Sequence, residues 1–186
     1  VGEELLRHPR VRRIAFTGET GTGKHVAECA GREMKRLTLE LGGSDPMIVC
    51  DDAALDAAVT GAAVGRFYNC GQACLAIKRL YLFEAIYDQF VEKLIGKAQR
   101  LKVGNGLDKD TRLGPLHTAA QRQEIEEQVA DAVKRGGKVL AGGKRPEGAE
   151  YAKGFFYLPT LIAEVPDDAR IVREESFGPA LPIFKV

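Results

Sequence analysis

The chain has 186 residues, of which 45% are hydrophobic and 28% are charged, and its 27 Lys and Arg residues nearly balance its 26 Asp and Glu residues. This composition is typical of a folded globular protein, and it provides no basic surface for nucleic acid or for an anionic membrane. No apolar run reaches the roughly 18 residues of a membrane-spanning helix, and the N-terminus has no signal-peptide core. We therefore expect a cytoplasmic protein whose partners are small molecules.

The hydrophobic pattern alternates between strands and helices along the chain. Strands are expected at 11–17, 36–41, 45–50, 77–84, 139–143 and 181–186, with a strand or an extended segment at 154–162. Helices are expected at 22–35, 52–67, 87–101, 118–135 and 167–175. Because parallel strands need crossover connections, this alternation predicts an α/β fold with a mostly parallel sheet and flanking helices.

Both ends of the chain favour a piece of a longer protein. The chain begins on an apparent helix without a methionine, and it stops at the apolar run ALPIFKV (180–186), which has the pattern of a strand that lacks its neighbour. Within the chain, both the composition and the alternation of strands and helices begin anew after Gly42-Gly43. We therefore expect two parts, residues 1–42 and residues 43–186.

Four cysteines offer reactive or metal-binding sulfur, Cys29, Cys50, Cys70 and Cys74. None of their spacings is the C-x-x-C of a zinc knuckle or a redox pair, so we expect no metal site and, in an intracellular setting, no disulfide.

Cys74 follows a glycine and two amides at 69–74, which suit a tight turn. Backbone N–H groups in such a turn can stabilise a thiolate and the oxyanion formed when it attacks a carbonyl. The alternative is a small buried hydrophobic side chain.

A glycine-rich stretch at 18–23 lies between an expected strand and an expected helix, where N–H groups can hold a phosphate. Written as G-x-x-x-x-G-K it resembles a nucleoside-triphosphate P-loop, and the aspartate that ends 46–51 would hold magnesium. However, His25 stands where a P-loop needs a hydroxyl ligand for magnesium. The second interpretation is a dinucleotide loop, in which Val26 replaces the third glycine of G-x-G-x-x-G. The third is a turn that only begins a helix.

Five stretches, in their order and spacing, resemble the NAD(P)-dependent aldehyde dehydrogenase superfamily over nearly the whole chain. They are FTGETGTG at 16–23, LELGGSDP at 39–46, FYNCGQACLAIKR at 67–79, GNGLDKDTRLGPL at 104–116 and EESFGP at 174–179.

The resemblance implies roles for particular residues. Cys74 is the expected nucleophile, because the family places the thiol after glycine-glutamine-any, and Cys70 is then a bystander or a packing residue. Glu40 is the expected general base. The implied contacts with NAD or NADP come from Gly18, Glu19, Gly23, Leu41, Glu175 and Phe177. Glu19 stands where many members carry serine, so it is expected to face a ribose hydroxyl or solvent.

The implied reaction is the oxidation of an aldehyde to a carboxylic acid with NAD or NADP, of which NAD is favoured, through a thiohemiacetal and a thioester on the cysteine. Residues 1–42 then are the C-terminal remnant of a Rossmann-like dinucleotide-binding domain, and residues 43–186 a catalytic domain incomplete at its C-terminus. The parent protein is expected to be a homodimer or a homotetramer, and the chain alone to be inactive. The alternatives are a P-loop-like nucleotide-binding protein and a catalytically silent structural relative.

Overall fold

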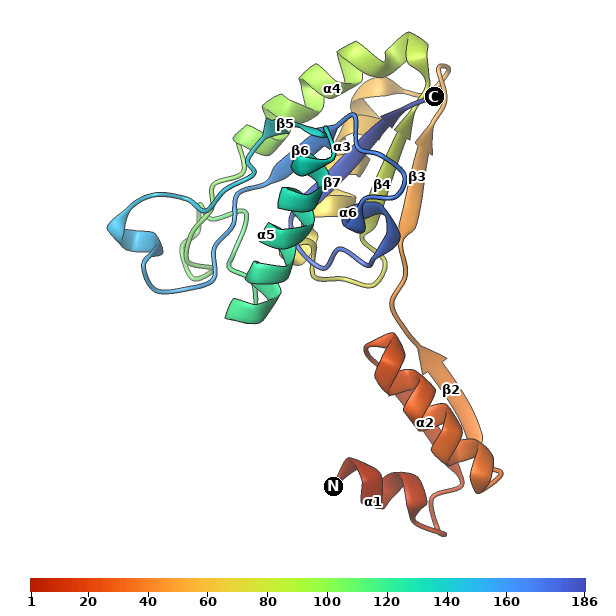
Figure 1. Ribbon diagram of the computed structural model, residues 1–186. Helices are drawn as coiled ribbons and strands as arrows, with labels where there is room; N and C mark the ends of the chain where they lie inside the picture. The colour runs from red at the N-terminus through yellow and green to blue at the C-terminus, as the bar shows by residue number, and fades with distance from the viewer. The chain divides into compact units, whose positions relative to one another are not determined.

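The computed structural model describes residues 1–186, which form two compact units, Val1–Gly43 and Ser44–Val186 (Figure 1). Each unit has its own sheet and its own hydrophobic core. No helix in either unit combines the length and the apolar character that crossing a membrane requires.

The first unit consists of helix α1 (Gly2–Arg7), strand β1 (Arg13–Thr17), helix α2 (Thr20–Arg32) and strand β2 (Arg36–Glu40). Strands β1 and β2 pair in parallel, and α2 is the crossover between them. The core is small, because only Ile14, Val26 and Ala30 form its buried cluster. A hydrogen bond also connects α1 to the segment before β2, because Lys35 Nζ donates to the carbonyl of Leu6 in α1 at 2.6 Å.

Helix α2 begins earlier than the hydrophobic pattern predicts, so only Gly18 and Glu19 separate it from β1. The cause is a cap. The Glu19 carboxylate accepts hydrogen bonds from the N–H groups of Gly21 at 2.6 Å and Thr22 at 2.9 Å. Residues 20–23 are therefore helical, whereas a P-loop needs a glycine-rich loop there to surround phosphates. This geometry argues against the P-loop interpretation.

The second unit is built on a five-stranded sheet in the order β3-β4-β7-β6-β5. Its strands are β3 (Asp45–Val49), β4 (Ile77–Leu82), β5 (Lys138–Ala141), β6 (Thr160–Ala163) and β7 (Ala180–Lys185). Its helices are α3 (Leu55–Phe67), α4 (Glu84–Gln99), α5 (Ala119–Lys134) and α6 (Arg170–Arg173), with short 3-10 turns at Tyr68–Gly71 and Ala149–Tyr151. All strand pairs are parallel except β5 with β6. The predicted α/β fold with a mostly parallel sheet is confirmed.

Fully buried side chains stabilise the centre of this sheet. Leu80 and Leu82 of β4 and Leu181 and Ile183 of β7 have no exposed surface. Burying such a side chain stabilises the fold by about 1.5–3 kcal/mol. Helix α3 contacts α4, and α5, which crosses in front of the sheet in Figure 1, contacts α6.

Two expected elements are reduced to less than half of their expected length. Of the expected segment 154–162 only residues 160–162 belong to a strand, β6, and Phe155 makes an isolated bridge with Leu116. Pro159 lacks an N–H group and cannot continue a ladder toward the N-terminus. The expected helix at 167–175 is reduced to Arg170–Arg173, because a turn closed by the N–H of Ala169 on the Pro166 carbonyl precedes it.

Candidate functional site

The Cys74 turn and the EESFGP loop come together because each precedes one of two neighbouring parallel strands. Cys74 precedes β4, and the segment 174–179 precedes β7, which pairs with β4. The amino ends of parallel neighbours lie at the same edge of a sheet. The structure therefore places Cys74, Glu175 and Phe177 at one edge of the second unit.

The chain leaves α3 through a turn with unusual backbone angles. Asn69, Cys70 and Gly71 have φ values of 49°, 58° and 74°, in the left-handed region that costs non-glycine residues about 1–2 kcal/mol each. Two side chains hold the turn: the Asn69 amide donates to the Gln72 carbonyl at 2.9 Å, and the Gln72 amide donates to the Asn69 carbonyl at 3.1 Å. The Gln72 side-chain oxygen also accepts from the N–H of His117 at 2.8 Å. These bonds fix the backbone just before Cys74.

Gly71 is required by both its conformation and its surroundings. Its φ is positive, and a Cβ at this position would overlap the carbonyl of Gly178 in the EESFGP loop. The two segments therefore approach each other more closely than any side chain at position 71 would allow.

The two cysteines of the turn differ in access. Cys74 is exposed, whereas Cys70 is buried with 3% of its surface accessible. Burial raises the pKa of the Cys70 thiol to about 12, which keeps it protonated and unreactive near neutral pH. Cys74 is the thiol of this turn that a substrate can reach.

Lys78 is a fully buried ammonium directly behind the Cys74 turn. It shares the inward face of β4 with Leu80 and Leu82. It donates to the backbone carbonyls of Ala73, Cys74 and Ala76. Its Nζ also lies 3.7 Å from Glu175 Oε1 and 3.8 Å from Asp45 Oδ2. Lys78 thus fixes the carbonyls around Cys74 and places a positive charge between them and Glu175.

Arg66, at the end of α3, is the second buried cation of this region. Its guanidinium has no exposed surface, and burial lowers the pKa of Arg66 to about 10. It donates to Ile77, Gly71, Ser176 and Gly178, mostly through backbone carbonyls. Gly71 belongs to the turn that follows α3, and Ile77 begins β4. Ser176 and Gly178 belong to the EESFGP loop. One side chain therefore joins the three segments that surround Cys74.

In the first unit, the remaining predicted residues gather where β1 and β2 end. The N–H of Gly18 donates to the Glu40 carbonyl at 3.1 Å, and the Glu40 side chain is exposed. Gly23 is buried against Leu41, whose methyl groups occupy the space that a Cβ at Gly23 would need. Gly18, Gly23, Glu40 and Leu41 thus form one group within the first unit.

Glu19 lies at this end of the first unit but points into its own helix. The N–H groups of Gly21 and Thr22 hold the pKa of Glu19 below its ordinary value. An ionised carboxylate therefore occupies the helix N-terminus, the position where a phosphate would otherwise be favoured. Glu19 is exposed, in line with the expected contact with solvent, and the sequence pattern did not predict that its carboxylate also caps α2.

Glu175 presents a partly exposed carboxylate at this edge of the second unit, with 28% of its side chain accessible. Its buried Oε1 accepts no hydrogen bond, but it lies 3.7 Å from the Nζ of Lys78 and forms an ion pair with it. The accessible part of the carboxylate can accept a hydrogen bond from a ligand hydroxyl, such as that of a sugar. At the N-terminus of α2, by contrast, the Glu19 carboxylate already accepts from the N–H groups that would otherwise bind a phosphate.

Comparisons with known proteins identify the family. The model of the aldehyde dehydrogenase family matches residues 1–186, so the chain belongs to this family. It is 42% identical to the succinate-semialdehyde dehydrogenase [NADP(+)] GabD of Escherichia coli over 185 residues, which are 100% of this chain and 38% of that protein. It is 44% identical to a glutarate-semialdehyde dehydrogenase of Pseudomonas aeruginosa over 186 residues, with the same coverage. The chain thus spans about 38% of the length of the curated relatives that it matches.

Solved structures agree with this assignment. A 3,6-anhydro-L-galactose dehydrogenase in complex with NAP has a TM-score of 0.96 and 42% identity, covering 100% of this chain and 39% of that one. A betaine aldehyde dehydrogenase of Staphylococcus aureus in complex with NAD+ has a TM-score of 0.95 and 36% identity, covering 100% of this chain and 37% of the other. The relatives therefore include proteins with NADP and proteins with NAD.

Proposed function

We propose that the whole protein containing this chain oxidises a small aldehyde to a carboxylic acid with NAD or NADP, and that Cys74 is the nucleophile. The observation that supports this proposal most directly is the contrast within the turn, where Cys74 is exposed and Cys70 is buried. A nucleophile must be accessible to the substrate, and its backbone must be held in place. The hydrogen bonds from the side-chain amides of Asn69 and Gln72 hold the backbone of the turn.

The proposed reaction begins when the Cys74 thiolate attacks the aldehyde carbon. A C–S bond forms and the carbonyl electrons move to oxygen, giving a thiohemiacetal whose oxyanion needs N–H donors. A bound nicotinamide ring would supply the acceptor for the hydride on that carbon. Loss of the hydride would leave the acyl group on Cys74 as a thioester. We assign Glu40 to remove a proton from the water that cleaves the C–S bond, which releases the acid and returns the thiol.

The cofactor contacts are proposed at both predicted groups. Glu175, held by its ion pair with Lys78, offers the accessible part of its carboxylate to a ribose hydroxyl, and Phe177 lies two residues further along the same loop. Gly18, Gly23 and Leu41 supply a surface at the carboxyl end of β1 and β2, with Glu19 as a structural cap. The preference for NAD over NADP and the division into a dinucleotide-binding remnant (1–42) and a catalytic part (43–186) stay predictions.

Replacing Glu40 by glutamine in the whole protein tests the second half of the reaction. The variant keeps the attack and the hydride transfer but loses the base, so a burst of NAD(P)H should precede a steady rate that is about 10²–10⁴-fold lower. Stopped-flow absorbance with succinate semialdehyde, glutarate semialdehyde and betaine aldehyde measures both phases. Glu28→Gln, an exposed glutamate on α2, is the matched control. Unchanged steady turnover in Glu40→Gln would remove Glu40 from this role.

A further inference from the structure

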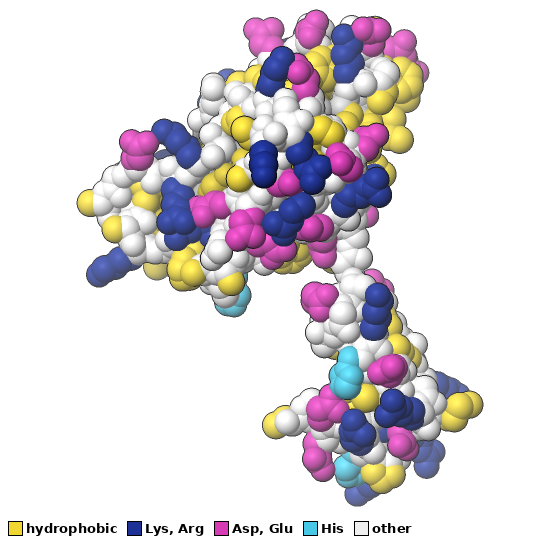
Figure 2. Space-filling view, in the orientation of Figure 1, with side chains coloured by type: hydrophobic (Ala, Val, Ile, Leu, Met, Phe, Trp, Pro, Cys, Tyr) yellow, Lys and Arg dark blue, Asp and Glu magenta, His cyan; other side chains and the backbone are white.

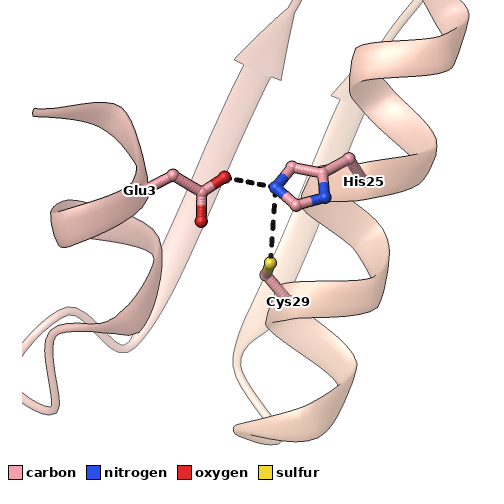
Figure 3. Close-up of side chains that lie close together, drawn as sticks. All are labelled: Glu3, His25 and Cys29. Carbon is pink, nitrogen blue, oxygen red and sulfur yellow. Dashed lines mark hydrogen bonds and ion pairs between the residues drawn. The ribbon is translucent and has the colours of Figure 1, made fainter.

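Three side chains of the first unit, none of which has a role in the proposed reaction, converge on one point. Glu3 comes from α1, and His25 and Cys29 come from α2, one turn of helix apart on the same face (Figure 3). The Nε2 atom of His25 contacts a carboxylate oxygen of Glu3 and lies 3.7 Å from the sulfur of Cys29. One oxygen, one nitrogen and one sulfur atom all lie within 4.8 Å of one another.

This donor set suits zinc better than the other common metal ions of proteins. Zinc binds thiolate at about 2.3 Å and imidazole or carboxylate at about 2.0–2.2 Å in tetrahedral sites. Neighbouring ligand atoms of such a site are then about 3.4–3.6 Å apart. The distance of 3.7 Å between Nε2 and Sγ already matches that spacing. A thiolate ligand disfavours magnesium and calcium, which prefer oxygen.

The pair of Glu3 and His25 must open for an ion to enter, and both side chains are free to do so. Their exposed fractions are 55% for Glu3 and 48% for His25. Glu3 also accepts a hydrogen bond from Arg7 at 3.3 Å, an exposed contact that competes weakly for the carboxylate. Cys29 is buried, with 6% of its surface accessible, and provides the fixed ligand. The site therefore has one rigid and two adjustable donors.

The first unit also has a structural use for such an ion. Helix α1 has six residues, none of them buried, and no side-chain cap. The buried core beneath it consists of Ile14, Val26 and Ala30. Small cores of this kind are commonly supplemented by a metal, whose binding energy becomes folding energy.

We propose that Glu3, His25 and Cys29 form a zinc site that ties α1 to α2, with water as the fourth ligand. Binding replaces the thiol proton of Cys29 by a Zn–S bond and releases that proton to solvent, so no oxidation or reduction occurs. The site is structural, because it holds two helices together and adds nothing to the chemistry at Cys74. The sequence pattern alone does not reveal this site, because Glu3 is distant in sequence from the His-x-x-x-Cys pair at 25–29.

The test titrates the metal-free chain with zinc and with cobalt. We expect one zinc per chain with at least micromolar affinity, a cobalt spectrum with a thiolate charge-transfer band, and a raised midpoint of thermal unfolding. Cys29→Ser should abolish the band. Glu3→Gln, a surface change that leaves the core intact, removes a direct ligand and should weaken zinc binding by at least the roughly 10- to 100-fold that loss of an outer-shell partner costs. Cys50→Ser changes an exposed cysteine outside the proposed zinc site and outside the Cys74 turn, and it serves as the control. It should change neither the charge-transfer band nor the zinc affinity.

Circular dichroism of the metal-free variants separates lost binding from lost folding. The proposal is overturned if folded chain binds no zinc at micromolar concentration. It is equally overturned if the band and the affinity are the same in Cys29→Ser and Glu3→Gln as in the unchanged chain, because the metal then sits on other thiols.

Discussion

Replacing Cys74 by alanine in the whole protein is expected to lower aldehyde-dependent NAD(P)H formation by about 10⁴-fold or more. The reason is that the thiohemiacetal and the thioester both need the sulfur, so the variant loses the covalent route. The variant should fold normally, because the side chain is exposed and accepts no hydrogen bond in the structure. Initial rates at saturating semialdehyde, with cofactor binding measured separately, give the result.

Two matched variants sharpen this expectation. Cys50→Ala removes another exposed thiol and should leave the rate within about twofold, since surface changes away from a site have small effects. If Cys74→Ala retained the activity, the nucleophile would have to be sought elsewhere. If the unchanged protein formed no NAD(P)H from any aldehyde, the catalytically silent relative would be the better description.

Replacing Arg66 by leucine is expected to destabilise the chain by about 3 kcal/mol or more. The change removes the guanidinium donors of the buried carbonyls of Gly71 and Ser176, and each unpaired buried acceptor costs about 1–3 kcal/mol. The Gly178 carbonyl loses one of its two donors and keeps the N–H of Ala180. The gain from no longer burying a guanidinium offsets part of this cost, but the several lost hydrogen bonds to a charged donor outweigh it. Urea unfolding of the chain measures the difference.

Arg100→Leu, at an exposed arginine after α4, is the control for lost charge and should stay within about 0.5 kcal/mol. Arg66→Lys should fall between the two, because an ammonium keeps the charge but cannot span the same set of carbonyls. Equal stability of Arg66→Leu and the unchanged chain would show that this buried network contributes nothing to the fold.

The sequence pattern predicted the fold well, because apolar periodicity reflects burial directly. It also predicted the turn before Cys74, where Gly71 stands at the position that needs a positive φ and no Cβ. It misplaced the start of α2, because a glycine-rich stretch favours a loop unless a carboxylate such as Glu19 caps it. The location in the cytoplasm and the oligomeric state of the parent stay predictions.

Arg66 and Lys78 were missed for a different reason. Basic side chains are assigned to solvent by default, and both residues are fully buried. A signal was present in each case: Arg66 continues the buried stripe of Ala62 and Ala63 in α3, and Lys78 alternates with Leu80 in β4. What no pattern shows is the set of carbonyls that pair with them, because those come from segments distant in the sequence.

The most direct test of Cys74 as the nucleophile is to find the acyl group on it. The Glu40→Gln variant of the whole protein is mixed with a semialdehyde and NAD(P), quenched in acid and cleaved after Arg66 and Lys78. The resulting peptide, residues 67–78, carries both Cys70 and Cys74, so fragment-ion mass spectrometry must distinguish the two sulfurs. We predict the added acyl mass on Cys74 alone. An acyl group on Cys70, or product formation with no acyl group on this peptide, would contradict the proposed mechanism.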